Sequence, residues 1–295
     1  MYYTSDSVLF LDGRFVKAED AKVDLFGQTL HYGYGVFEGI RAYQTINGTK
    51  IFKSHEHYER LKRSCDLLSL PLSYSEEELT QLSYQLLEKN NLSNAYLRPL
   101  VFSGPNMSLT APKEVSIMIA AWDWGKYFSH TSLRVCISSY QRPNPKSIRM
   151  EAKACGHYVN SIMATTEAKE RGFDEALMTD MNGFVAEGPG ANFFFEKDGI
   201  LYTPPLGNIL PGITRKTVLD ICHELDIPVQ ERLFRPEELF EADGAFFCGT
   251  AAEITAIESI EGQSFSKSWK KTFGSVIQEA YQNIVKDKSY SYVIV

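Results

Sequence analysis

Short apolar runs along the chain are separated by turn-forming dipeptides. Asp-Gly and Asn-Gly tolerate the positive φ angles of a type I′ turn, which favours β-hairpins where apolar runs flank the pair. Such pairs occur in both halves of the chain, so we expect antiparallel strands in both and exclude a purely parallel, doubly wound sheet. The four pairs are Asp12-Gly13, Asn47-Gly48, Asn182-Gly183 and Asp198-Gly199.

Helical periodicity alternates with these strands. From Ser54, a candidate N-cap, apolar residues recur at three- and four-residue spacing, and Ser75 with Glu78 forms a capping box before the next apolar stripe. The pattern predicts a mixed α/β or α+β fold with two domains. Further helices are expected over 159–171, 214–225 and 268–285, and strands over 96–102, 115–122, 133–138, 175–179 and 245–248.

A length of 295 residues predicts one large or two medium domains. The boundary is expected near 123–132, where an apolar strand gives way to Trp124-Gly125-Lys126-Tyr127. The tail, 289–295, is compatible with a short strand or an ordered end, and the pattern does not decide between them.

Composition narrows the class of protein. Hydrophobic residues make up 44% and charged residues 23% of the chain, as in ordinary globular proteins. The net charge of −7 argues against binding to nucleic acid or an anionic membrane. The five cysteines form no Cys-x-x-Cys pair, and neither a signal peptide nor a membrane-length apolar run is visible. We therefore expect a soluble protein of the reducing cytoplasm, without a structural metal.

Lys153 is the first candidate for chemistry. It lies among small side chains in Glu151-Ala152-Lys153-Ala154-Cys155-Gly156, just before a predicted helix. An amine that is desolvated there and held close to a planar ligand would be suited to act as a nucleophile. A solvated surface lysine is the alternative that this local sequence leaves open.

Three glycine-containing turns are candidate ligand sites. In Glu187-Gly188-Pro189-Gly190-Ala191-Asn192, two glycines permit close approach of the backbone to a ligand. Leu210-Pro211-Gly212-Ile213-Thr214-Arg215 precedes a predicted helix whose first amides suit a phosphate. Cys248-Gly249-Thr250-Ala251-Ala252-Glu253 offers further amides for an oxyanion. Each turn is also compatible with an ordinary loop or a simple helix start.

Tyr96 and Arg98 alternate on a predicted strand, so both side chains leave the same face and form a candidate carboxylate receptor. The alternative is a half-exposed sheet face. His55-Glu56-His57 invites a metal interpretation, but residues i and i+2 diverge on a helix, which argues against it. The aromatic residues Trp122, Trp124 and Tyr127 are interpreted as core or pocket wall.

Together these elements resemble the branched-chain amino-acid aminotransferases, which are fold-type IV pyridoxal-phosphate enzymes. The resemblance extends over nearly the whole chain, and the order of the motifs is more specific than any one of them. The matching segments are His31-Tyr32-Gly33, Val36-Phe37-Glu38-Gly39-Ile40-Arg41, the helix of Arg60, Ala95-Tyr96-Leu97-Arg98-Pro99, 153–158, 187–193, 210–215 and 249–253.

The resemblance implies a site for pyridoxal 5′-phosphate. Lys153 would bind the cofactor covalently and, once displaced, carry a proton between the substrate Cα and the cofactor. Glu187 would face the pyridine nitrogen, and Tyr158 would donate a hydrogen bond to the phenolic oxygen. The phosphate would be held by Arg60, Ile213, Thr214 and Thr250.

The resemblance also implies a pocket for two unlike side chains. The α-carboxylate would be received by Tyr96, Thr250 and Ala251, and the distal carboxylate of glutamate by Arg98. The aliphatic wall would consist of Phe37, Trp124, Tyr127 and a Tyr32 supplied by the neighbouring subunit. We therefore expect a homodimer, or a larger homo-oligomer built from dimers. Cys155 and His157 depart from residues found near the lysine in other members and leave fine details of pocket polarity open.

The implied architecture is a small N-terminal domain (1–123), an interdomain loop (124–132) and a large C-terminal domain (133–295) that carries the lysine, with the active site at the domain interface. The implied activity is ping-pong transfer of the amino group of L-leucine, L-isoleucine or L-valine to 2-oxoglutarate. Alternatives are a D-amino-acid aminotransferase or aminodeoxychorismate lyase on the same scaffold, or a non-catalytic metabolite-binding protein.

Overall fold

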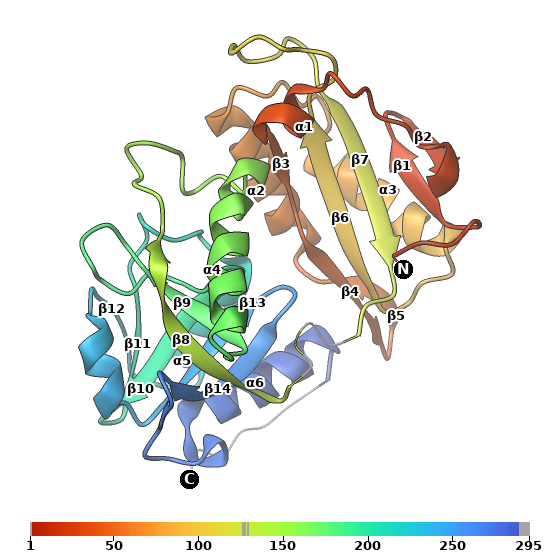
Figure 1. The fold of residues 1–295 in the computed structure, drawn as a ribbon. Coiled ribbons are helices and arrows are strands. Elements are labelled where there is room, and N and C mark those ends of the chain that lie inside the picture. Colours follow the sequence, from red (N-terminus) through yellow and green to blue (C-terminus); the bar gives the residue numbers. More distant parts are fainter. Residues whose placement is uncertain (1, 126–127, 129, 289–295) are drawn as a thin grey trace. The chain divides into compact units, whose positions relative to one another are not determined.

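The computed structural model describes residues 2–125, 128 and 130–288 (Figure 1). The chain divides into two compact units. The first unit consists of Met1–Gly125 and Ala152–His157, and the second of Lys126–Glu151 and Tyr158–Val295. Both are mixed α/β, as predicted. Tyr127 and the tail 289–295 lie outside the described residues, so the predictions for them stay predictions.

The first unit is built on a seven-stranded sheet with the order β2-β1-β7-β6-β4-β5, in which β3 also pairs with β6. All of its described strand pairs are antiparallel. The elements are β1 (Val8–Leu11), β2 (Arg14–Lys17), the 3-10 turn η1 (Ala18–Asp20), α1 (Gln28–Tyr32), β3 (Gly35–Phe37), β4 (Ile40–Thr45), β5 (Gly48–Ile51), α2 (Ser54–Leu67), α3 (Glu76–Lys89), β6 (Ala95–Phe102) and β7 (Ser116–Trp122).

Helices α2 and α3 cover one face of this sheet (Figure 1). Their apolar stripes, which include Leu61 and Leu86, pack with Leu97 and Val101 of β6 in a single core. Because side chains alternate along a strand, Tyr96 and Arg98 leave the opposite face, away from the helices. The periodicity of β6 thus separates core residues from candidate site residues.

The second unit contains an eight-stranded mixed sheet with the order β12-β11-β10-β13-β14-β8-β9 and β15 beside β14. Strand β8 pairs parallel with both β9 and β14. Strand β13 pairs antiparallel with both β10 and β14. The elements are β8 (Ser132–Gln141), η2 (Cys155–His157, in the first unit), α4 (Tyr158–Glu170), β9 (Glu175–Thr179), β10 (Asn192–Lys197), β11 (Ile200–Thr203), α5 (Ile213–Glu224), β12 (Val229–Glu231), η3 (Pro236–Glu241), β13 (Gly244–Gly249), β14 (Glu253–Ile260), β15 (Gln263–Ser264), η4 (Trp269–Lys271) and α6 (Phe273–Val285).

The hairpin predictions are confirmed at two sites and need correction at two. Asp12-Gly13 and Asp198-Gly199 join β1 to β2 and β10 to β11 with positive φ at both residues. In the β4–β5 hairpin Thr45 pairs with Gly48, so Ile46 and Asn47 form the turn, one position earlier than predicted. Asn182-Gly183 instead lies in a turn beside the isolated bridge Thr179–Val185. Asp180 stabilises this turn, because its carboxylate accepts hydrogen bonds from the backbone N–H groups of Asn182 and Phe184.

The helix predictions hold within a few residues at most ends. The capping box at Ser75 is present, but Ser54 is the first residue of α2 and not its N-cap; Lys53 takes that position with φ 50°. The last helix begins at Phe273, later than the predicted 268, because a 3-10 turn precedes it. Among the described residues, no helix combines the length and hydropathy that a membrane span requires.

One domain prediction is wrong. Lys153 was expected in the C-terminal domain, whereas Ala152–His157 belongs to the first unit. The reason is a set of backbone contacts: Phe37 N donates to Lys153 O, Gly156 N donates to Gly33 O, and Ala154 bridges to Val36. The segment thus returns to the first unit before α4 begins.

Candidate active site

Lys153 packs against the end of strand β3. Its carbonyl accepts a hydrogen bond from Phe37 N at 3.0 Å. Its Nζ lies 5.0 Å from the centre of the Phe37 ring, a distance at which an ammonium group is attracted to an aromatic face. The structure therefore brings together the predicted lysine and a residue of the predicted aliphatic wall.

A serine that the sequence analysis did not select also holds Lys153. Ser64, buried on α2, accepts a hydrogen bond from Lys153 N at 3.1 Å and donates one to Arg60 O at 2.8 Å. The backbone of the lysine is thereby connected to the helix that carries Arg60. A serine that bonds the carbonyl four residues before it is common in helices, so only the tertiary contact shows its role.

Arg60, the predicted phosphate ligand, is buried and engaged in an ion pair. Its Nε and Nη2 donate to the Glu38 carboxylate at 2.6 and 2.9 Å. His57, one helical turn earlier, contacts the same carboxylate through Nδ1 at 2.8 Å. Neither Glu38 nor His57 was predicted as a site residue. The signal available in the sequence was the i, i+3 spacing of His57 and Arg60, which places both on one helix face.

Among the described residues, no group of His, Cys, Asp and Glu side chains is arranged to hold a metal ion. Of the His55-Glu56-His57 motif, His57 is buried against Glu38 and His55 is exposed, because residues i and i+2 leave different faces of a helix.

Tyr96 and Arg98 form the predicted pair on the face of the first sheet opposite helices α2 and α3. Arg98 Nη2 donates to the Tyr96 hydroxyl at 3.2 Å, and the guanidinium lies over the Phe37 ring at 4.7 Å. The buried Nε of Arg98 has no hydrogen-bond partner among the described residues. Because an unsatisfied buried donor costs about 1–3 kcal/mol, this atom favours an anionic ligand.

Aromatic rings surround this pair. Trp124 lies edge-on to Tyr96 with ring centres 4.3 Å apart, and Trp122, opposite Tyr96 on β7, stacks on Trp124. The carbonyl of Trp124 accepts a hydrogen bond from Arg41 at 3.2 Å, so the sequence after β7 is tied to β4. Trp122 and Trp124 are confirmed as packed aromatic residues.

Gly39 makes room for the Tyr96 hydroxyl. A Cβ atom at position 39 would lie 1.9 Å from that oxygen, which is far inside van der Waals contact. We expect Gly39→Ala to displace Tyr96 and lower kcat/KM about 10- to 100-fold with cofactor content unchanged. Steady-state kinetics would check this. Gly104→Ala is the matched control, since a Cβ there meets nothing within 4 Å, and equal kinetics for both variants would contradict the assignment.

Glu187 is the centre of a hydrogen-bond network in the second unit. The side chain is buried, and it accepts hydrogen bonds from Asn192 Nδ2 at 3.0 Å and from Leu210 N at 3.2 Å. Arg142 Nε lies 3.1 Å from its Oε1. Several donors around one buried carboxylate stabilise the ionised form and fix its orientation. Arg142 and Asn192 are partners that the sequence analysis did not assign.

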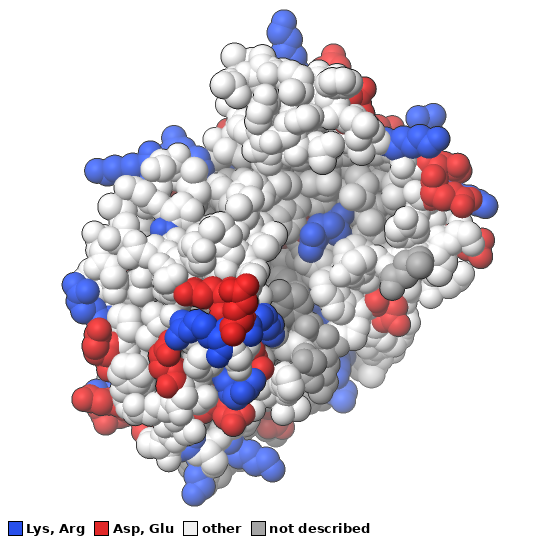
Figure 2. Space-filling view, viewed as in Figure 1, with Lys and Arg blue, Asp and Glu red and all other residues white. Residues whose placement is uncertain are grey.

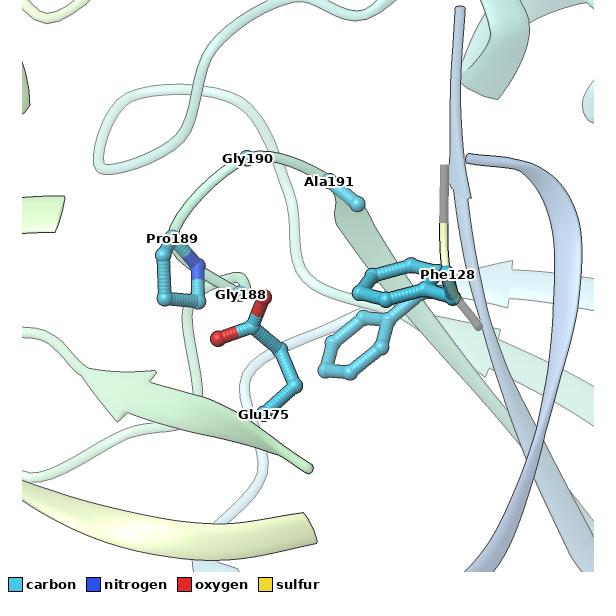
Figure 3. A pocket seen from close by; sticks show the side chains of 7 residues that line it. Phe128, Glu175, Gly188, Pro189, Gly190 and Ala191 are labelled. Carbon is cyan, nitrogen blue, oxygen red and sulfur yellow. The ribbon is translucent and has the colours of Figure 1, made fainter. Parts of the chain in front are cut away.

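The turn after Glu187 is tightly packed (Figure 3). A Cβ at Gly188 would lie 2.9 Å from the Phe247 ring, which explains the glycine. Figure 3 shows Glu175, Phe128 and the residues 188–191 around this point. Burial raises the pKa of Glu175, whose carboxylate accepts from Thr165 Oγ1 at 3.0 Å.

Helix α5 begins at Ile213, one residue before the predicted start at Thr214, in the segment that the sequence suggests as an anion site. Gly212, its N-cap, makes no side-chain cap hydrogen bond, and the first-turn amides of an α-helix have no partner within the helix. A Cβ at Gly212 would lie 1.9 Å from Asn192 Oδ1, so the helix start approaches the Glu187 network closely. Thr250 and Ala251 lie in the half-buried turn between β13 and β14.

Two predicted tyrosines lie at helix ends. Tyr158 is the first residue of α4 and is half-buried. Tyr32 is the last residue of α1 and is 47% exposed, with its hydroxyl 3.4 Å from Met107 O. The described residues of this chain do not bury the Tyr32 ring.

Comparison with known proteins identifies the family. Residues 35–260 match the model of the amino-transferase class IV family, and this segment contains Lys153, Glu187, Tyr96 and Arg98. The chain therefore belongs to the class IV aminotransferases.

Close relatives narrow the family to the branched-chain-amino-acid aminotransferases. One, from Pseudomonas aeruginosa, is 39% identical over 293 residues, covering 97% of this chain and 95% of its own. A crystal structure of the branched-chain aminotransferase from Thermoproteus uzoniensis with norvaline has a TM-score of 0.92 at 42% identity, covering 96% of this chain and 95% of that one. The enzyme from Thermobaculum terrenum in its PLP-form has a TM-score of 0.91 at 31% identity, covering 97% and 95%.

Class IV aminotransferases use pyridoxal 5′-phosphate, and the donor groups of this chain fit it. The amine of Lys153 would suit the aldehyde, and the buried carboxylate of Glu187 would suit the ring nitrogen. The start of α5 offers amides without a side-chain cap for a phosphate. The three groups match the three chemically different parts of the cofactor.

Proposed function

We propose that the chain transfers the amino group of L-leucine, L-isoleucine or L-valine to 2-oxoglutarate by a ping-pong mechanism. The observation that carries the proposal is the Tyr96–Arg98 pair, whose cationic end and aromatic surroundings suit both a carboxylate and an aliphatic side chain. The printed names of the relatives support the same substrate class.

In this proposal Lys153 carries a proton during the reaction, and Glu187 is the acidic partner of the cofactor's pyridine ring. When bound, pyridoxal phosphate withdraws electrons from the substrate Cα through its protonated pyridine ring. Lys153 holds the cofactor and then moves the proton to and from Cα. Glu187 keeps the pyridine nitrogen protonated.

The other residues bind and orient. Tyr158 holds the phenolic oxygen, and the phosphate is held by the guanidinium of Arg60 together with the amides and hydroxyls of Ile213, Thr214 and Thr250. Tyr96, Thr250 and Ala251 receive the α-carboxylate. The aliphatic wall would consist of Phe37, Trp124 and Tyr127 together with a Tyr32 supplied by the neighbouring subunit.

Arg98→Met tests the division of the pocket. Methionine keeps an unbranched apolar stem but loses the cation, so we expect KM for 2-oxoglutarate to rise about 10- to 100-fold, the cost of a charge-assisted hydrogen bond. KM for 4-methyl-2-oxopentanoate should change less than about threefold. Steady-state assays with each acceptor measure this. Arg63→Met, an exposed arginine on α2, is the control, and equal losses for both acceptors would refute the role of Arg98.

We also infer a homodimer, the smallest form of the predicted oligomer. Val159, Ile162 and Met163 of α4 are 61%, 65% and 42% exposed and recur at helical spacing. The surface over the first turns of α4 lacks charge on the face shown in Figure 2, whereas charged groups gather over its C-terminal end. In the first unit, Leu25, Phe26, Leu30 and Tyr32 are exposed as well. Adjacent exposed apolar side chains favour burial against a second copy.

Ile162→Asp tests this interface. Sedimentation equilibrium should give twice the chain mass for the wild-type protein and a single chain mass for the variant, because a buried carboxylate without a partner is costly. The variant should also lose activity, since each pocket would lack the partner's tyrosine. Ile46→Asp is the control, because Ile46 is 77% exposed in the β4–β5 turn. A monomeric wild-type protein would exclude the proposal.

We further propose that the protein works in the cytoplasm. All five cysteines are free thiols, and Cys65, Cys136, Cys222 and Cys248 are buried. Thiols persist in reducing compartments.

A further inference from the structure

The cluster of Glu38, His57 and Arg60 has no part in the proposed reaction beyond Arg60 itself. The side chains of Glu38 and His57 are 0% and 1% exposed, and Arg60 is 9% exposed. Glu38 follows strand β3, whereas the two nitrogen-bearing side chains come from α2. Its carboxylate therefore links helix α2 to the sheet at the position between Phe37 and Gly39.

The cluster contains one ion pair, between Glu38 and Arg60, and a neutral His57. Burial lowers the pKa of His57 and outweighs the opposing effect of Glu38, so the ring is neutral. A carboxylate can only accept, so the contact at 2.8 Å assigns the proton to Nδ1. The pKa of Glu38 is below its usual range despite burial, because Arg60 and His57 stabilise the carboxylate. The carboxylate is thus ionised, and its partner is the guanidinium.

The ion pair uses one edge of the guanidinium. The contacts to Glu38 occupy Nε–H and one N–H of Nη2. Arginine has five N–H groups in a planar fork, so the other three, on Nη1 and Nη2, point away from Glu38. A fixed Nε edge determines the direction of the opposite edge, because the group is rigid and planar.

We propose that Glu38 and His57 are positioning residues that hold the Arg60 guanidinium in the orientation in which it binds the cofactor phosphate. The carboxylate reduces the net positive charge, but it fixes a long side chain before the phosphate arrives, so less side-chain entropy is lost on binding. His57 in turn restrains the carboxylate through its Nδ1–H. This inference rests on the assignment of Arg60 to the phosphate.

The experiment compares two ligands on the full-length protein from which the cofactor has been removed. Pyridoxamine 5′-phosphate and pyridoxamine differ only in the phosphate, and neither has the aldehyde that would react with Lys153. Calorimetric titration gives Kd for each ligand. The ratio used here is the Kd of pyridoxamine divided by the Kd of pyridoxamine 5′-phosphate, and it isolates the contribution of the phosphate to affinity.

The variants separate positioning from folding. We expect His57→Leu and Glu38→Gln to reduce this ratio about tenfold, the lower end of what losing an orienting partner costs at other ligand sites. His57→Asn should retain most of the ratio, because its side-chain amide can donate from nearly the place of Nδ1. Ser83→Ala, which removes the buried Tyr58–Ser83 hydrogen bond between α2 and α3, is the stability control and should leave the ratio unchanged.

The outcomes distinguish the two assignments. If Arg60→Met leaves the ratio at the wild-type value, the phosphate role of Arg60 fails. If Arg60→Met lowers the ratio but neither His57→Leu nor Glu38→Gln does, the positioning role is overturned. A variant that weakens both ligands in equal proportion has a structural effect only and contradicts the proposal. If His57→Leu does not fold, Glu38→Gln and His57→Asn decide the question by the same ratio.

Discussion

Lys153→Ala is expected to reduce turnover by about 10⁴-fold or more, because covalent attachment and proton transfer are lost together. The variant should remain folded, since the hydrogen bonds that join this residue to Phe37 and Ser64 are made by its backbone. Coupled assays with L-leucine and 2-oxoglutarate measure the loss. Lys146→Ala, an exposed lysine in the second unit, is the control.

Chemical trapping locates the lysine independently of activity. Borohydride reduces the bond between the cofactor and its lysine, and peptide mapping then shows which residue carries the phosphopyridoxyl group. We expect the label on Lys153. A label on another lysine would refute the assignment, even if Lys153→Ala were inactive.

Glu187→Gln is expected to slow proton transfer at Cα about 10²-fold while the cofactor stays bound. The carboxylate accepts from Asn192 and Leu210 N and lies 3.1 Å from Arg142 Nε. Glutamine has the same shape but loses the charge that keeps a pyridine nitrogen protonated. Single-turnover kinetics with L-leucine and with its Cα-deuterated form would show the slower step and a larger isotope effect.

A matched control exists for this substitution. Glu175 is also buried in the second unit, and its carboxylate accepts from Thr165 Oγ1 and Ala176 N. Glu175→Gln should leave single-turnover rates within about threefold of wild type, because most substitutions away from a reacting group act on stability. Wild-type rates for Glu187→Gln would remove its role at the ring nitrogen.

Local patterns were sufficient where a short stretch of chain decides its own conformation. The capping box at Ser75, the turns at Asp12 and Asp198 and the strand of Tyr96 and Arg98 were all predicted. Each depends on backbone preference or on side-chain alternation, which neighbouring residues determine. The prediction of Ser54 as the N-cap of α2 was wrong, because Lys53, in a left-handed conformation, takes that position.

The resemblance of the ordered motifs added the family, and the comparisons confirm it. It supplied candidate roles for Lys153 and Glu187 but not their neighbours. Ser64, Glu38 and Arg142 have no local signal, because a serine, a glutamate or an arginine in a helix, turn or strand end is common.

The amino-acid sequence by itself determined the mixed α/β class and most element positions, and it predicted which residues carry the chemistry that we propose, because periodicity, turn chemistry and motif order are local properties. Only the tertiary structure decided that Lys153 packs with the first unit, that Glu38 and His57 hold Arg60, and that Asn192 and Arg142 surround Glu187. Asn192 is 5 positions from Glu187, whereas Ser64 is 89 positions from Lys153 along the chain. The free energy of burying and pairing such groups depends on which segments the fold brings together.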